Sequence, residues 1–140
     1  MNRRSFLAGA AGVGGLTLAG CTGYAQPSAD ADYDIGMTAS AFVPVEVEIS
    51  AGETLVWKNT GSRAHTVTAY EARIPDAAAY FASGGFDDEI AAREGYASGF
   101  KGTIQSSDTF EHRFAVPGEY HYFCIPHERG GMKGRVIVNE

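Results

Sequence analysis

The sequence predicts an all-β fold, a sandwich of two sheets interrupted by one long excursion that contains short helices. Three observations support this prediction. The chain of 140 residues contains 18 glycines and many β-branched and aromatic residues, a composition that favours strands and tight turns. Several short segments alternate apolar and polar residues with the period of two that a half-buried strand requires. One pair of segments, around "AVPGEY", places its aromatic residues so that they belong to different sheets.

The strands are expected in order along the chain. In "VPVEVEIS", Val45, Val47 and Ile49 face one way, while the intervening glutamates face the other way. The segments "TLVWKN", "HTVTAY" (65–70) and "RVIVN" (135–139) have the same strand character. Because "RVIVN" ends the chain, we expect it to lie within a sheet and to close the fold.

The segment around "AVPGEY" indicates two sheets rather than one. Phe114 lies on the aromatic face of the strand before the Pro-Gly turn, and Tyr120 lies on that of the strand after it. A two-residue hairpin would pair Phe114 with His121, and the two aromatic faces would then point in opposite directions. An arch that carries the chain into a second sheet lets both faces point into one core.

Residues 71–107 do not keep strand spacing. Two alanine-containing stretches within them, "IPDAAAYFASGG" and "FDDEIAAREGY", have helical potential. We therefore expect an excursion with one or two short helices, which is free to cover an end of the sandwich.

The N-terminus has the pattern of an export signal. Arg3 and Arg4 open "RRSFL", which resembles a twin-arginine signal, and the apolar stretch that follows is too short to be a membrane span. The tetrapeptide "LAGC" resembles the lipobox of exported lipoproteins, in which the cysteine, here Cys21, is lipidated. The alternative is an ordinary signal peptide that is cut elsewhere, with Cys21 incidental.

These patterns divide the chain into three parts. We expect a signal peptide over 1–20, a small, polar and proline-containing tether over 21–33 and a single domain over 34–140. Lipidated Cys21 would anchor the protein to the outer face of the cytoplasmic membrane. The net charge of −6, with no basic run beyond the N-terminus, makes nucleic acid an unsuitable partner.

The chain has two cysteines, so lipidation of Cys21 leaves Cys124 without a disulfide partner. A free thiol is a liability in an oxidising compartment unless something occupies it. A metal ion would occupy it.

Three residues of metal-ligand type lie together in "YFCIPHERGGMKG" (122–134), namely Cys124, His127 and Met132. Pro126 prevents a regular helix through this loop, and the two glycines permit sharp turns, so the three side chains can meet at one point. This combination selects copper, because zinc rarely takes methionine and a c-type haem needs a C-x-x-C-H motif that is absent. A blue copper electron-transfer site needs one more histidine.

The further histidine is identified by elimination among three candidates. His121 lies three residues before Cys124 on the same strand, so it points to the opposite face and towards solvent. His112 lies between two inward phenylalanines and is better explained as a hydrogen-bonded, partly buried histidine. His65 opens a strand after the flexible "NTGSRA" loop, where a ligand can reach the end of a sandwich. His65 is therefore the expected fourth ligand.

The stretch "WKNTGSRAHTV", followed by "VPGEYHYFCIPHERGGMKGRVIVN", resembles the plastocyanin-type cupredoxins and, most of all, the halocyanins, small blue copper proteins of haloarchaea. The resemblance extends over residues 35–140 and implies a Greek-key, cupredoxin-like β-sandwich. It places the family's copper ligands on four residues, His65, Cys124, His127 and Met132. It also implies that the backbone N–H of Thr66 donates to the thiolate. Ile125 stands where a serine or threonine is common, so a side-chain hydrogen bond is lost there.

The resulting hypothesis is an electron carrier, not an enzyme, with one copper ion per chain that alternates between Cu(I) and Cu(II). Its expected partners are membrane-bound or soluble redox proteins, which a monomer would meet through the exposed edge of His127 and an apolar patch around it. A copper carrier or storage protein with the same ligands is the alternative, although such proteins usually keep open or methionine-rich sites. A metalloenzyme would need an open coordination position and an acid–base set, neither of which is evident.

Overall fold

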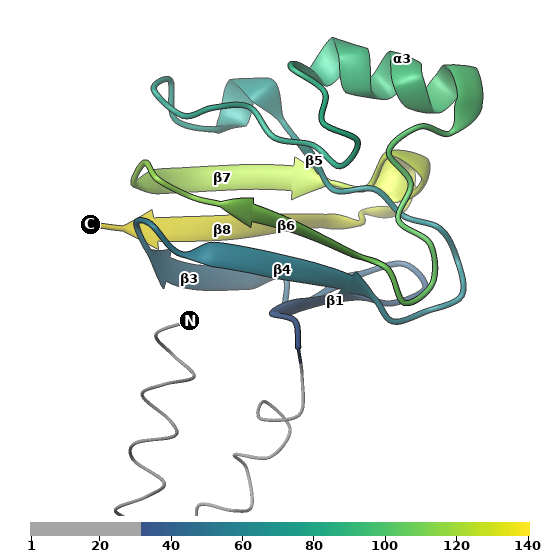
Figure 1. Ribbon diagram of the computed structural model, residues 1–140, viewed down its shortest axis with the longest axis horizontal. Helices are drawn as coiled ribbons and strands as arrows, with labels where there is room; N and C mark the ends of the chain where they lie inside the picture. The colour runs from purple at the N-terminus through teal and green to yellow at the C-terminus, as the bar shows by residue number, and fades with distance from the viewer. Residues whose placement is uncertain (1–31) are drawn as a thin grey trace, which may run out of the picture. The chain divides into compact units, whose positions relative to one another are not determined.

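The computed structural model describes residues 32–140, and its compact unit spans Tyr33–Glu140. In this part of the chain the strands form two four-stranded sheets packed face to face, with the helical segments outside them (Figure 1). The expected signal peptide (1–20), lipidated Cys21 and nearly all of the tether (21–33) lie outside the described residues. Among the residues that are described, no helix has the length and apolar character needed to cross a bilayer.

The first sheet contains the predicted "TLVWKN" strand. Its members are β1 (Ile35–Met37), β2 (Phe42–Val43), β4 (Thr54–Asn59) and β6 (Thr109–Arg113). They lie in the order β2-β1-β4-β6. Along β4 the buried residues Leu55, Trp57 and Asn59 alternate with half-exposed ones, as expected of a strand with one face on the core.

The second sheet contains the strand that ends the chain. Its members are β3 (Glu46–Ser50), β5 (Thr68–Ala69), β7 (Gly118–Phe123) and β8 (Lys133–Asn139). They lie in the order β3-β8-β7-β5, with β8 parallel to β3 and antiparallel to β7. The prediction that the last strand lies within a sheet is confirmed.

The connection from β6 to β7 carries the chain from one sheet to the other, as the arch predicted. Phe114 and Tyr120 are both 1% exposed, and their rings meet edge to face with centroids 4.9 Å apart. Trp57 from the first sheet contacts Tyr122 from the second in the same geometry at 5.4 Å. One aromatic core therefore joins the two sheets, and the predicted all-β sandwich is confirmed.

Two predicted strands differ from the observed ones. Val45 is predicted to face the same way as Ile49, but it precedes β3 and is 59% exposed, whereas Ile49 is 4% exposed. Alternation predicts which side chains share a face, but it does not predict how far the opposite sheet extends over them. The strand expected over 65–70 pairs with β7 only at Thr68–Ala69, because its first residue, His65, bridges to Ile104 of the excursion instead.

The excursion contains the short helices that were predicted. A single turn, η1 (Glu71–Arg73), is followed by α3 (Glu89–Gly99). The Asp88 carboxylate accepts a hydrogen bond of 2.7 Å from the backbone N–H of Ala91, which caps the start of α3. Phe100 ends α3 in the left-handed conformation, with φ of 56°.

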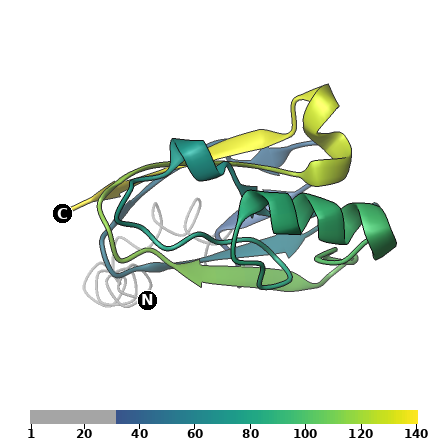
Figure 2. The ribbon, with the colours of Figure 1, turned by 90° about the horizontal axis from the view of Figure 1, so that it is seen from above.

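The position of α3 relates the excursion to the ligand loop. Figures 1 and 2 both show α3 beside the turn η2 (Ile125–Gly130), at the end of the sandwich away from the C-terminus. A side chain of α3, Arg93, pairs with Glu128 of that turn. The excursion therefore covers part of the end at which the candidate ligands lie.

Candidate metal centre

Three donor atoms converge at this end of the sandwich. The Nδ1 atoms of His65 and His127 are 3.2 Å apart. The Sγ atom of Cys124 lies 3.5 Å from Nδ1 of His65 and 3.4 Å from Nδ1 of His127. These three residues form the one potential metal-binding cluster of His, Cys and acidic side chains found within residues 32–140. Sequence elimination therefore selected the histidine that the fold brings to Cys124.

His65 is held by the sandwich and the excursion together. Its backbone N–H donates to the Ile104 carbonyl at 3.2 Å, and the Ile104 N–H donates back at 2.7 Å. The buried Asn59 amide donates to the carbonyls of Arg63 and Ile104, at 2.6 and 2.8 Å. These bonds fix the strand start on both sides of His65, whose side chain is completely buried.

Cys124 and His127 lie on a loop that closes on itself. The Cys124 N–H donates to the carbonyl of Met132 at 3.0 Å, and the Met132 N–H donates to the carbonyl of His127 at 3.2 Å. Pro126 opens the turn, and Gly131 takes the positive φ of 90° that lets the chain return. The turn is kinked rather than a regular helix, as Pro126 predicted, and of its two glycines only Gly131 takes a positive φ. The loop ends at Met132, which is 1% exposed.

The donor triangle fits a bound metal ion. A point equidistant from three atoms that are 3.2–3.5 Å apart lies about 2 Å from each, which is the distance at which imidazole nitrogen binds metals. Four residues, His65, Cys124, His127 and Met132, would hold the ion. Because this donor set combines soft sulfur with imidazole nitrogen, the ion that it suits is copper.

The protonation of the site favours metal binding at neutral pH. Burial lowers the pKa of both imidazoles, which are therefore neutral and able to act as ligands. Burial also raises the pKa of the Cys124 thiol, against the opposing effect of a hydrogen bond from Thr66. The thiol is therefore protonated in the metal-free protein, and binding of a metal releases that proton.

Thr66 connects the strand of one ligand to the loop of the others. Its backbone N–H donates to Sγ of Cys124 at 3.5 Å, as the family resemblance implied. Its hydroxyl accepts a 2.9 Å hydrogen bond from the Ile125 N–H and lies 3.0 Å from the Thr68 hydroxyl. Ile125 offers no side-chain hydrogen bond, so the Thr66 hydroxyl holds its backbone instead. Sequence reasoning missed this hydroxyl, because 59 residues separate the two partners.

The two rejected histidines lie away from the cluster. His112 stacks on Phe81 with ring centroids 4.5 Å apart, and burial lowers its pKa. His121 is partly exposed, and its Nε2 lies 3.2 Å from a carboxylate oxygen of Glu119. The predicted partial burial of His112 is confirmed, while ring contacts rather than the predicted hydrogen bond surround it, and His121 points away from the core as predicted.

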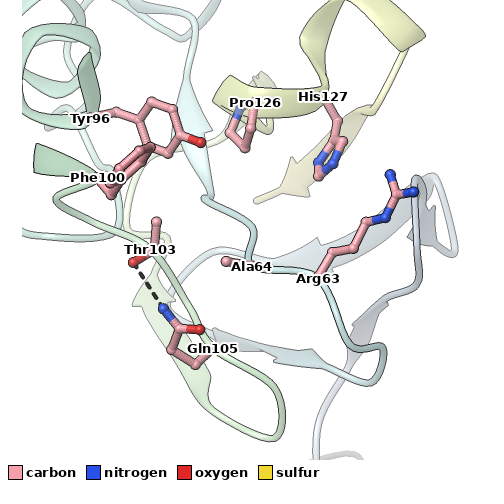
Figure 3. Close-up of a pocket in the computed structure, with 8 residues that line it drawn as sticks. All are labelled: Arg63, Ala64, Tyr96, Phe100, Thr103, Gln105, Pro126 and His127. Carbon is pink, nitrogen blue, oxygen red and sulfur yellow. Dashed lines mark hydrogen bonds between the residues drawn. The ribbon is translucent and has the colours of Figure 1, made fainter.

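An open groove of about 490 Å³ borders His127 (Figure 3). Its walls come from three distant segments and comprise Arg63, Ala64, Tyr96, Phe100, Thr103, Gln105, Pro126 and His127. Phe100 is 67% exposed, so the groove has an apolar rim. The excursion supplies half of this lining, which the sequence did not predict, because helical periodicity does not show which loop a helix will contact.

Comparison with known proteins gives one consistent result. The model of a family described as copper binding proteins, plastocyanin/azurin family, matches residues 29–139. The chain is similar to plastocyanin B of Populus nigra, at 37% identity over 99 residues, which are 71% of this chain and 52% of that protein. It is also similar to the plastocyanin of Scenedesmus fuscus, at 31% identity over 100 residues, which are 71% of this chain and 88% of that protein.

Solved structures with this fold include an amicyanin and a plastocyanin. The amicyanin of Paracoccus versutus matches with a TM-score of 0.51 and 27% identity, over 80% of this chain and 88% of that chain. The oxidised plastocyanin of the fern Dryopteris crassirhizoma matches with a TM-score of 0.52 and 21% identity, over 75% of this chain and 98% of that chain. The second likeness concerns the fold alone.

Proposed function

Because the chain belongs to the plastocyanin/azurin family of copper-binding proteins, we propose that it is a blue copper protein that carries single electrons between other redox proteins. The donor triangle of His65, Cys124 and His127 is the observation that carries this proposal. Met132, buried at the end of the same loop, would be the fourth residue to hold the ion.

The chain's contribution to electron transfer is a site that resists rearrangement. Bound copper supplies a one-electron couple between Cu(I) and Cu(II), and the two ions prefer different geometries. His65 is held by paired backbone hydrogen bonds, and Cys124 by the N–H groups of its own loop and of Thr66. Donors that stay in place keep the reorganisation that accompanies each electron small, while the buried aromatic side chains around them exclude water.

His127 is the proposed contact point for a partner. Its ring is the least buried of the three donors, and it lies beside the groove that Pro126 and Phe100 help to line. A small, partly apolar surface suits an encounter that must form and dissociate quickly. The proposed partners are membrane-bound or soluble redox proteins, and the proposed carrier is a monomer.

The place of action that we propose is the outer face of the cytoplasmic membrane. The twin-arginine and lipobox patterns support export followed by lipidation of Cys21. We also propose that the chain is a halocyanin-like member of its family. Mass spectrometry of the membrane fraction would test it, because a lipidated chain begins at Cys21 and carries the mass of acyl groups, whereas a Cys21→Ser chain would carry none.

A copper carrier or storage protein would use the same ligands but must release Cu(I) to a partner. The burial of Cys124 and His65 favours retention of the ion over release. Repeated chemical oxidation and reduction distinguishes the two functions, because an electron carrier keeps its copper through many cycles and a metal carrier loses it to a competing chelator.

The decisive experiment adds Cu(II) to the purified domain and records the visible spectrum. We expect an intense blue thiolate-to-copper band that disappears on reduction and returns on oxidation. Cys124→Ala removes the thiolate, so the band must be absent from this variant, while His121→Ala serves as a control that retains it. A wild-type protein without the band, or a band that survives in Cys124→Ala, would refute the proposed function.

A further inference from the structure

One side chain of the excursion forms a salt bridge with the ligand loop. Arg93, on the inner side of α3, donates two hydrogen bonds to the Glu128 carboxylate, from Nη1 to Oε1 at 2.8 Å and from Nη2 to Oε2 at 3.1 Å. Such a two-pronged pair fixes orientation as well as distance. Glu128 directly follows the ligand His127 in the chain, so this salt bridge lies one residue from the site.

We propose that Arg93 is a positioning residue for the copper site, which holds the loop of His127 so that this ligand keeps its place in both oxidation states. The inference rests on the proposed electron-transfer function and extends it to a residue outside the ligand set. The ligand loop needs an external hold, because η2 is an irregular turn with a kink at His127 (φ −119°, ψ 15°). A short irregular turn by itself opens easily.

The same guanidinium also contacts the residue before the other loop ligand. Its Cζ atom lies 4.4 Å from the ring centroid of Phe123, which immediately precedes Cys124. Tyr70 stacks on that ring at 4.3 Å, and its hydroxyl donates to Oε2 of Glu128 at 2.7 Å. Arg93 and Tyr70 therefore each contact both Phe123 and Glu128. These two residues lie next to the ligands of the loop in the sequence.

Arg93 can act as a fixed point because α3 is itself fastened. The Glu89 carboxylate accepts from Nε of Arg93 at 2.9 Å, which orients the guanidinium from behind. Glu89 and Glu71 exchange hydrogen bonds between their side chains and backbones, at 2.9 and 3.1 Å, which ties the start of α3 to η1.

A purely structural role for Arg93 is the competing explanation. In that case the pair would fasten α3 to the sandwich and have no effect on copper. The two roles differ in what they change. A structural role alters the melting temperature of the metal-free protein, whereas a positioning role also alters properties of the bound copper.

The test compares Arg93→Ala, Arg93→Lys and a charge-matched control, Lys101→Ala, in the copper-loaded protein. Lys101 is exposed and lies just after the end of the same helix. Two rates are measured at high ionic strength, where surface charge is screened. They are electron self-exchange, from NMR line broadening, and transfer of Cu(I) to a chelator.

We expect Arg93→Ala to slow self-exchange and to speed copper transfer by roughly threefold to tenfold each, the effect of losing a partly exposed charge pair and a cation–π contact. Arg93→Lys keeps the charge but cannot make the paired hydrogen bonds of the guanidinium, so its rates should lie between those of the wild type and Arg93→Ala. Lys101→Ala should match the wild type.

Glu128→Gln provides a second route if Arg93→Ala does not fold, because it preserves shape and removes only the charge. It should change both rates in the same direction by a smaller factor. The proposal is overturned if the rates of the folded Arg93 and Glu128 variants equal those of the wild type, or if Lys101→Ala changes them equally. Absence of a blue band from the wild type would instead refute the proposed function, so the two failures are distinguishable.

Discussion

The two histidine ligands occupy contrasting regions of the molecule. His65 is fully buried, and its backbone is bonded in both directions to Ile104. His127 lies on an irregular turn at the edge of an open groove and is only partly buried. His65 is positioned by the folded domain, whereas the position of His127 depends on a short loop and on the salt bridge that joins this loop to α3.

This difference separates two requirements of an electron carrier. A ligand inside the sandwich preserves the geometry of the site, because moving it would disrupt packed structure. A ligand at the surface brings the site within reach of a partner, but it is exposed to solvent and free to move. The salt bridge from Arg93 to Glu128 limits that freedom without burying the ring.

The largest difference between the two histidines is expected when the imidazole ring of each is removed in turn. His65→Gly and His127→Gly should both lose the blue band, but imidazole added to the solution should restore it only in His127→Gly. The groove beside His127 admits a small molecule, whereas the place of His65 is completely enclosed. Titration with imidazole, followed by visible absorption, makes the measurement. Equal recovery in both variants would remove the contrast between the two histidines.

The rigidity of the sandwich can be tested at Gly134 on β8. A Cβ atom at this position would collide with the ring of Tyr122, which lies directly across from it on β7. Gly134→Ala should therefore lower the free energy of unfolding by about 2 kcal/mol, measured by urea denaturation of the metal-free protein. Gly130→Ala is the matched control, since an added Cβ meets nothing there within 4 Å. A neutral Gly134→Ala would mean that Tyr122 is free to move.

The excursion can be loosened without touching the loop or the core. Asp88→Ala removes the carboxylate that caps α3 and should cost about 1 kcal/mol. Hydrogen exchange should quicken in α3 and leave the amides of β4 unchanged. Asp87→Ala, at an exposed neighbouring position, should have little effect. Faster exchange throughout the domain would show that α3 and the sandwich unfold as one unit.

The smallest expected effect is the pH dependence of the stability that the Arg93–Glu128 salt bridge contributes. The pKa of Glu128 is lowered from 4.5, chiefly by the hydrogen bonds from Arg93, so the charged pair favours the folded state. This stabilisation is complete above pH 4.5 and is lost as the pH falls through the lower pKa of the folded state.

Both side chains of the pair are partly exposed, 39% for Arg93 and 26% for Glu128, so the stabilisation is at most about 1 kcal/mol. The stability of the metal-free wild type should exceed that of Glu128→Gln near pH 7 and should approach it at more acidic pH. A difference between the two proteins that does not change with pH would show that ionisation of Glu128 contributes nothing.

Much of the fold was predictable because the signals for strands are local. The strand character of "TLVWKN" predicted β4, and the parity of the segment around Pro117 predicted two sheets. The exposure of Val45 and the shortness of β5 were not predictable. Both depend on where the opposite sheet and the excursion end, and no local pattern records those limits.

The sequence by itself determined the chemistry of this protein. The type and spacing of Cys124, His127 and Met132 selected copper, and strand parity left His65 as the partner, because ligand preference and side-chain alternation are properties of residues and of their neighbours. Only the tertiary structure decided how the site is held and reached. The salt bridge from Arg93 to Glu128 joins residues 35 positions apart, and the groove beside His127 joins three separate segments of the chain. Such contacts arise from packing rather than from any local pattern.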